Sequence, residues 1–144
     1  MSQPRDAIEA LYREVVLDHY RHPRHRDPLS DPTGSATVDN PICGDQVRVQ
    51  VRTAAKQLEA VAAQTRGCSI AVAAGSVMTE VAPGHTLDRI VELRSAVESL
   101  IEGGEPDSSL DRRLRAFAGV ARFPARRRCA LLPWEALEAA LRQA

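Results

Sequence analysis

The period of the apolar positions changes along the chain, and these changes predict its main elements. Apolar residues recur every three to four positions over residues 5–20, which predicts an N-terminal helix. Pro23 and Pro28 follow and are expected to end it. Over residues 45–53, valines then alternate strictly with polar side chains. That alternation is typical of a half-buried antiparallel strand.

Two less regular segments flank this strand. Residues 35–40 are predicted to form a short strand that leads into a loop, and residues 58–65 a returning strand. Residues 53–57 connect the two longer strands as a hairpin turn, although this turn contains no glycine. The first half of the chain therefore supplies three neighbouring strands.

Helical periods dominate the second half. An alanine-rich run over residues 70–81 suits a closely packed helix, and Thr86 is expected to cap a further helix that Gly103 ends. After a short amphipathic piece at residues 110–117 and a loop at 119–124, a last helix is predicted with Pro133 in its first turn. Cys129 would then lie just before that helix.

Strands followed by helices indicate an α+β fold, in which a small antiparallel three-stranded sheet is covered by helices on one side. At 144 residues the chain is long enough for one domain with its own core, and we expect a single domain over residues 1–144. The formal net charge is zero, so no overall field favours nucleic acid or an anionic membrane as a partner. No apolar run approaches the length of a membrane span, and residues 1–6 have no signal-peptide pattern, so we expect a cytoplasmic protein.

The three cysteines are the residues that say most about chemistry. An odd number of cysteines without a signal peptide argues against a disulfide framework and for thiol chemistry or a metal. Cys43, Cys68 and Cys129 each lie at the boundary of a predicted element, and Asp45 follows Cys43 across a glycine. Three thiols and one carboxylate make four ligands, the coordination number that zinc prefers.

Other interpretations of the same residues remain open at this point. Three thiolates also suit iron within a cluster, and three cysteines can be buried simply as small apolar residues. A hydrolase with a nucleophilic cysteine is disfavoured, because it needs an orienting histidine and nothing marks an oxyanion site. His85 is the single histidine outside the N-terminal region, and we expect His19, His22 and His25 to be surface and packing residues.

Several of these segments resemble a known family. The Asn-Pro-Ile-Cys-Gly-Asp of residues 40–45, the Gly-Cys-Ser-Ile of 67–70 and the stretch at 126–134 are similar, in this order, to the IscU/NifU-like scaffolds of iron–sulfur cluster assembly. Within that family the chain resembles the SufU branch. IscU-type members have a histidine before the third cysteine and a Leu-Pro-Pro-Val-Lys segment, whereas this chain has Arg128 and lacks the segment. Its interval between Cys68 and Cys129 is also longer, by an insertion that includes residues 103–117.

The resemblance implies an IscU/SufU-like fold and a role for each candidate residue. It implies zinc bound by Cys43, Asp45, Cys68 and Cys129, with Cys43 as the sulfur acceptor and Arg126 as a supporting residue. The implied activity is that of a zinc-dependent sulfurtransferase, a sulfur acceptor and carrier. It would take persulfide sulfur from a SufS-type cysteine desulfurase and pass it to downstream iron–sulfur assembly proteins. The alternatives are an IscU-type scaffold that carries a [2Fe–2S] cluster and a non-catalytic adaptor stabilised by zinc.

Overall fold

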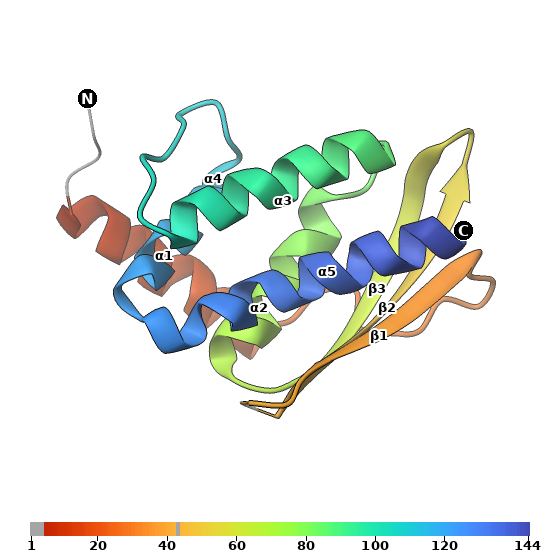
Figure 1. Ribbon diagram of the computed structural model, residues 1–144, viewed down its shortest axis with the longest axis horizontal. Coiled ribbons are helices and arrows are strands. Elements are labelled where there is room, and N and C mark those ends of the chain that lie inside the picture. Colours follow the sequence, from red (N-terminus) through yellow and green to blue (C-terminus); the bar gives the residue numbers. More distant parts are fainter. Residues whose placement is uncertain (1–4, 43) are drawn as a thin grey trace.

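The computed structural model describes residues 5–42 and 44–144 and confirms the α+β fold. Figure 1 shows a small sheet with its helices gathered on one side. In chain order the elements are α1 (Arg5–Arg21), β1 (Gly34–Asn40), β2 (Asp45–Ala54), β3 (Gln57–Arg66), α2 (Ser69–Val81), α3 (Leu87–Ile101), α4 (Arg112–Arg115), the 3₁₀ helices η1 (Ala116–Arg122) and η2 (Pro124–Arg126), and α5 (Arg127–Gln143).

The three strands pair antiparallel in the order β1-β2-β3. Val47, Val49 and Val51 on β2 are fully buried, so the alternation in the sequence marks the face that packs against the helices. The opposite face carries polar side chains such as Arg48. At one end of the sheet Asn40 pairs with Asp45, so the chain returns from β1 to β2 through a four-residue connection.

Small residues let the helices approach the sheet closely. α5 packs across β1 and β2, and α2 packs on β3, α1 and α5. A Cβ at Gly34 would lie 2.3 Å from the carbonyl oxygen of Ala140, and one at Gly75 would lie 2.8 Å from Thr65 Oγ1. The alanine-rich pattern of α2 therefore reflects a buried helix with room for few larger side chains. Each large buried side chain, such as Trp134, contributes about 1.5–3 kcal/mol by leaving water.

The segment between α1 and β1 covers part of the outer face of the sheet. The Ala63 amide donates to the carbonyl of His25 (3.1 Å), and the Leu29 amide donates to Gln50 Oε1 (3.1 Å). As a result Gln50, although it points away from the helices, is only 5% exposed. Arg48, on the same face and nearer to Asp45, remains exposed.

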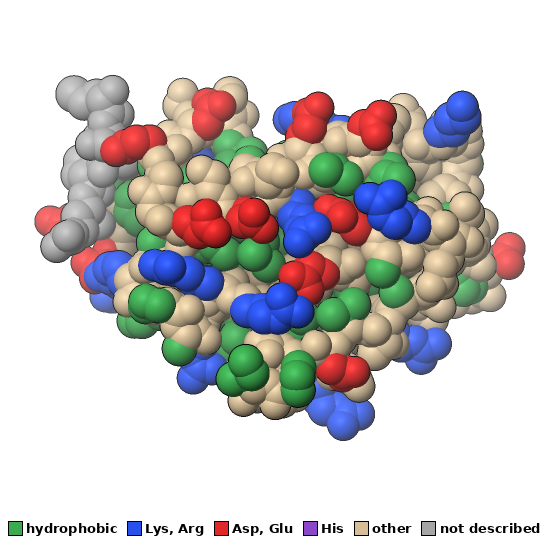
Figure 2. Space-filling view, in the orientation of Figure 1, with side chains coloured by type: hydrophobic (Ala, Val, Ile, Leu, Met, Phe, Trp, Pro, Cys, Tyr) green, Lys and Arg blue, Asp and Glu red, His purple; other side chains and the backbone are tan. Residues whose placement is uncertain are grey.

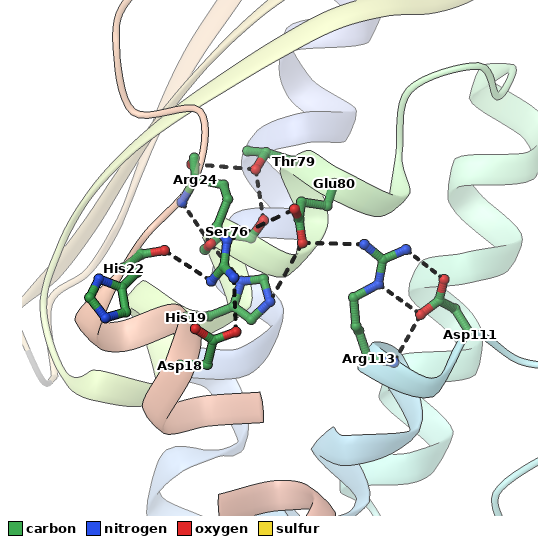
Figure 3. Close-up of polar contacts among 9 residues, drawn as sticks. All are labelled: Asp18, His19, His22, Arg24, Ser76, Thr79, Glu80, Asp111 and Arg113. Carbon is green, nitrogen blue, oxygen red and sulfur yellow. Dashed lines mark hydrogen bonds and ion pairs between the residues drawn. The ribbon is translucent and has the colours of Figure 1, made fainter. Parts of the chain in front are cut away.

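A polar cluster joins the end of α1 to α2 (Figure 3). His19 is buried, with Nδ1 2.7 Å from Ser76 Oγ and Nε2 3.5 Å from Glu80 Oε1. Ser76 Oγ also accepts from the Arg24 amide at 2.9 Å. His22 and His25 are both exposed, so the structure confirms the expectation of surface and packing histidines.

The last helix begins earlier than the sequence predicts. α5 starts at Arg127, so Cys129 lies inside its first turn and Pro133 lies in the helix interior, where we had expected its first turn. The start of α5 is not predicted because three consecutive arginines precede Cys129, and an apolar period begins only after them. The expected loop over 119–124 is also wrong: it lies largely within η1 and η2.

No helix among the described residues is long and apolar enough to cross a membrane. On the face seen in Figure 2, acidic and basic side chains are interspersed over α3 and α5. Arg94, for example, pairs with Glu138 at 3.2 Å.

Candidate metal centre

Asp45, Cys68 and Cys129 come together from three different elements. Asp45 is the first residue of β2, Cys68 is the N-cap of α2, and Cys129 is the third residue of α5. One carboxylate oxygen and the two sulfur atoms all lie within 4.8 Å of one another. Neither Cys68 nor Cys129 forms a disulfide bond, so this cluster offers two thiols and one carboxylate as metal ligands.

Asp45 is held in place by the residues that precede α2. Its Oδ1 accepts from the Cys68 amide at 3.1 Å, and its Oδ2 lies 3.7 Å from Cys68 Sγ. A Cβ at Gly67 would lie 2.2 Å from Oδ1, so the carboxylate occupies the space that any other residue at 67 would fill. With 2% of its surface exposed, Asp45 is a buried carboxylate that needs a polar or cationic partner.

Cys68 and Cys129 have different surroundings. Cys68 is half-buried, and as N-cap it makes no side-chain capping bond to α2. Its sulfur lies at the N-terminus of α2, 3.7 Å from Asp45 Oδ2. Cys129 is fully buried. Pro133, one turn later in α5, has no N–H with which to donate to the carbonyl of Cys129.

Cys43 lies outside the described residues, so its sequence assignment stays a prediction. The structure does describe the ends of the loop that contains it. The Gly44 amide donates to the carbonyl of Asn40 (2.8 Å), and the Ile42 amide donates to Asn40 Oδ1 (3.2 Å). Gly44 has φ +75, a conformation that glycine adopts without strain. The buried Asn40 thus fixes both sides of a loop that starts and ends next to Asp45.

The side chains of the three consecutive arginines at 126–128 have different partners. Arg127 donates to the carbonyl of Ala121 (3.1 Å), and Arg128 donates through two nitrogens to Glu135, both at 3.2 Å. Arg126 faces the thiols. The charge of Cys68, followed by hydrogen bonding to Cys129, raises the pKa of Arg126. Of the three side chains, Arg126 is the one placed to offset negative charge at the cluster.

Tyr12 is a neighbour of Cys68 that the sequence analysis does not identify, and it is flanked by Arg122 and Phe123. The pKa of Tyr12 is raised, mainly because the side chain is partly buried. The positive charge of Arg122 opposes this increase, and the charge of Cys68 adds to it. The Tyr12 and Phe123 rings lie 6.2 Å apart, and the guanidinium carbon of Arg122 lies 5.4 Å from the centre of the Phe123 ring. The apolar period of α1 gives no sign of this role for Tyr12, because a period shows only which face of the helix is apolar.

The described donors fit a zinc ion. Tetrahedral zinc bonds of about 2.0–2.3 Å place two donors about 3.3–3.8 Å apart. Cys68 Sγ and Asp45 Oδ2 already lie 3.7 Å apart, and a spacing within 4.8 Å for the whole cluster needs a closure of at most about 1 Å to reach that range. Two thiolates and a carboxylate suit zinc or iron better than magnesium or calcium, which prefer oxygen donors. A fourth ligand is needed to complete tetrahedral coordination, and the sequence offers Cys43 for it.

Comparison with known proteins places these residues in context. The NifU-like N-terminal domain family matches residues 11–143. The zinc-dependent sulfurtransferase SufU of Bacillus subtilis is 37% identical over 134 residues, which cover 91% of this chain and 89% of that protein. The iron–sulfur cluster assembly scaffold protein IscU of Streptococcus pyogenes is 31% identical over 137 residues, 94% of this chain and 86% of that protein.

Solved structures agree with the fold. A protein from Fervidobacterium islandicum, described as an iron–sulfur cluster assembly scaffold for the SUF system, superposes with a TM-score of 0.82 at 27% identity. That match covers 92% of this chain and 98% of the other. The N-terminal part of a NifU-like protein from Brucella abortus superposes with a TM-score of 0.83 at 25% identity, covering 94% and 95%.

Proposed function

The chain belongs to the family of NifU-like N-terminal domains, and on that premise we propose that it is a zinc-dependent sulfurtransferase for iron–sulfur cluster assembly. It accepts persulfide sulfur from a cysteine desulfurase of the SufS type. The observation that carries this proposal is the convergence of Asp45, Cys68 and Cys129 from three elements on one point. The similarity to the Bacillus subtilis SufU, over nine-tenths of the chain, supports zinc and sulfur transfer.

In this proposal Cys43, Asp45, Cys68 and Cys129 hold the zinc. When bound, zinc keeps the thiols deprotonated near neutral pH and blunts their nucleophilicity until one is released. Asp45 orients the cluster through its hydrogen bond from the Cys68 amide, and Arg126 offsets the excess negative charge of three thiolates and a carboxylate. These contacts hold two of the thiols in place while the third exchanges.

Cys43 is the sulfur acceptor. Its thiolate attacks the outer sulfur of the desulfurase persulfide, and a new S–S bond forms on Cys43. The bond between that sulfur and the desulfurase cysteine breaks, and the desulfurase cysteine leaves as a thiolate. No external oxidant or reductant is consumed. The assignment is supported by the place of Cys43 in a short loop with Gly44, whereas Cys68 and Cys129 lie in helix ends whose movement would disturb packing.

The partners follow from the same chemistry. A desulfurase supplies the sulfur, and downstream iron–sulfur assembly proteins receive it. We place the protein in the cytoplasm, because free thiols such as Cys68 persist in a reducing compartment.

A desulfurase assay with and without the protein tests the proposal, followed by mass spectrometry of its cysteine peptides. We expect stimulated turnover, one zinc per chain, and an added sulfur on the peptide that contains Cys43. Cys43→Ala should accept no sulfur. Added sulfur on Cys129, together with continued turnover of Cys43→Ala, would show that the acceptor is misassigned.

A second candidate function is an IscU-type scaffold on which a [2Fe–2S] cluster is built. The 31% identity to the Streptococcus pyogenes IscU favours it, and the described ligands also suit iron. Anaerobic incubation with iron, desulfurase and cysteine separates the two functions. A scaffold turns brown and gains visible absorption, whereas the sulfurtransferase stays colourless and keeps its zinc.

A further inference from the structure

A basic groove lies on the outer face of the sheet, at the end nearest Asp45 and Cys68. Its volume is about 530 Å³. We call it the arginine groove, and its described lining consists of Arg26, Asp27, Pro28, Gln46, Arg48, Gln64, Thr65 and Arg66. It lies on the face opposite the helices, behind the candidate metal centre, and no step of the sulfur chemistry above uses it.

Strand register places the arginines side by side. Gln46 on β2 pairs with Arg66 on β3, and Arg48 pairs with Gln64. Arg48 and Arg66 are therefore diagonal neighbours on one face, whose Cα atoms such a register separates by about 7–8 Å. Arg26 comes from the segment that crosses the outer face, and Gln64 Nε2 donates to its carbonyl at 2.6 Å. The sheet and this hydrogen bond hold three guanidinium-bearing residues around one groove.

These arginines differ from others in the chain in their pairing. Within residues 5–42 and 44–144, no carboxylate lies within salt-bridge distance of Arg26, Arg48 or Arg66. By contrast Arg52, farther along the same face of β2, is 3.3 Å from Glu59.

Two carboxylates lie near the groove and leave it basic. Asp27 is the one acidic residue of its described lining, and Asp39 beside it accepts from Gln46 Nε2 at 2.9 Å. Three arginines against these two carboxylates leave a net charge of about +1 at neutral pH. A chain with no net charge has thus concentrated positive charge at one place.

We propose that the arginine groove binds an acidic segment of a partner protein, a stretch of neighbouring Asp or Glu side chains. Guanidinium groups bind carboxylates through paired hydrogen bonds, and a groove along two strands fits an extended peptide. Its described lining contains no aromatic side chain on which a nucleic-acid base could stack, so a single-stranded nucleic acid fits it less well. A partner docked here would lie beside Asp45 and Cys68, and the groove would fix its orientation at the thiols.

The test measures binding of a fluorescein-labelled hexaglutamate peptide to the full chain by fluorescence anisotropy at low salt. Arg48→Gln and Arg66→Gln should each weaken binding on the order of tenfold, since each removes charge-assisted hydrogen bonds. Arg52→Gln is the matched control, on the same strand and face but already paired with Glu59, and it should bind as the natural protein does. Affinity should also fall as salt rises. Unchanged thermal unfolding of the variants confirms that their folds are intact.

Three results would overturn the proposal. The first is no binding of the peptide to the natural protein. The second is an equal loss in Arg52→Gln, which would mean that the peptide responds to overall charge and not to the groove. The third is tighter binding of a single-stranded hexanucleotide that is lost in the same two variants, which would make the groove a nucleic-acid site.

Discussion

At the scale of single residues, the candidate site depends on close contacts around one carboxylate. Asp45 lies against Gly67 and accepts a hydrogen bond from the Cys68 amide, while its second oxygen faces the Cys68 thiol. The carboxylate thus has two tasks, one toward the backbone and one toward the ligand cluster. Substitutions can separate them.

Asp45→Asn and Asp45→Ala should both lower sulfur transfer, but only Asp45→Ala should also lower the stability of the metal-free protein. Asn keeps an oxygen that can accept from the Cys68 amide but loses the charge, so zinc affinity and sulfur transfer should fall while the melting temperature of the metal-free protein holds. Ala leaves that amide without its acceptor and should cost a further 1–3 kcal/mol or so. Thermal unfolding of both metal-free variants, with zinc titration, measures this. Equal stability of the two variants would show that the hydrogen bond contributes nothing.

Gly67→Ala should weaken the site without touching a ligand. The added Cβ would lie 2.2 Å from Asp45 Oδ1, so the carboxylate must move away from Cys68. We expect at least a tenfold loss of zinc affinity, because misplacing one ligand by about 1 Å removes most of its bond. Arg66→Ala, one residue earlier and exposed, is the control and should bind zinc normally. Normal zinc binding by Gly67→Ala would contradict the geometry.

At the scale of elements, the turn between β2 and β3 shows where tertiary structure overrides local preference. The hairpin between β2 and β3 turns through Ala55 and Lys56, which both have positive φ, +53 and +66. Such a turn favours Asn and Gly, so the missing glycine noted in the sequence is a real local cost. The pairing of Gln57 with Thr86 and the bond from the Leu58 amide to the carbonyl of His85 (2.9 Å) stabilise the turn from outside.

Replacing the turn by Ala55→Asn with Lys56→Gly should therefore stabilise the protein by about 1 kcal/mol. Each natural residue costs about 1–2 kcal/mol in the left-handed region, and the greater freedom of unfolded glycine offsets part of the gain. Chemical denaturation measures the change. Lys56→Ala keeps the strain and should change little; a gain of the same size in that control would point to loss of the lysine charge as the cause.

The contact between α1 and α2 should make stability depend on pH. Burial, with the positive charge of Arg24, lowers the pKa of His19 in the folded chain, although Glu80 opposes this. The unfolded chain then binds a proton at a higher pH than the folded chain does. Stability is complete above the unfolded pKa of about 6.5 and falls as pH drops below it, by up to about 1.4 kcal/mol per pH unit.

Denaturation of metal-free protein between pH 8 and pH 5 measures this slope. His19→Asn retains an acceptor for Ser76 and should flatten the curve over this range. His22→Asn is the control, since that side chain is exposed, and should follow the natural protein. An unchanged slope in His19→Asn would assign the pH dependence to another group.

At the scale of the whole molecule, the candidate metal centre ties together the two halves of the fold. Its described ligands lie on β2, at the start of α2 and on α5, and α5 packs on both of the other two elements. A ligand that binds only the folded chain stabilises it by about 2.7 kcal/mol at a hundred times its dissociation constant.

Removal of zinc by a chelator should therefore lower the melting temperature by several degrees. Readdition should restore it, with an effect that shrinks as pH falls because protons compete for the thiolates. Cys129→Ser should lose most of this zinc-dependent increment, whereas Arg52→Gln should keep it. If the melting temperature of the natural protein does not change when zinc is removed or added, the site is not a metal centre.

Local pattern alone determined much of this protein. Three features can be predicted from neighbouring residues alone, because backbone geometry sets the periods of strands and helices. They are the valine alternation of β2, the alanine-rich period of α2 and the cap at Thr86. Side-chain chemistry also limited the possible metal ligands, since the chain has only three cysteines and Asp45 lies two residues from one of them. Even so, the composition of that site left zinc, an iron cluster and plain burial open until the family resemblance was considered.

Tertiary structure alone decided the remainder, because it depends on segments far apart in the chain. The approach of Asp45, Cys68 and Cys129 requires α5 to pack on both β2 and α2, and no local period encodes that distance. The same holds for the direction of Arg126 toward the thiols and for Tyr12 beside them. The start of α5 escaped prediction for a related reason. Its first turn contains Arg127 and Arg128, which show no apolar period. Burial of Cys129 in the core stabilises this turn, although Pro133 removes one of its backbone hydrogen bonds.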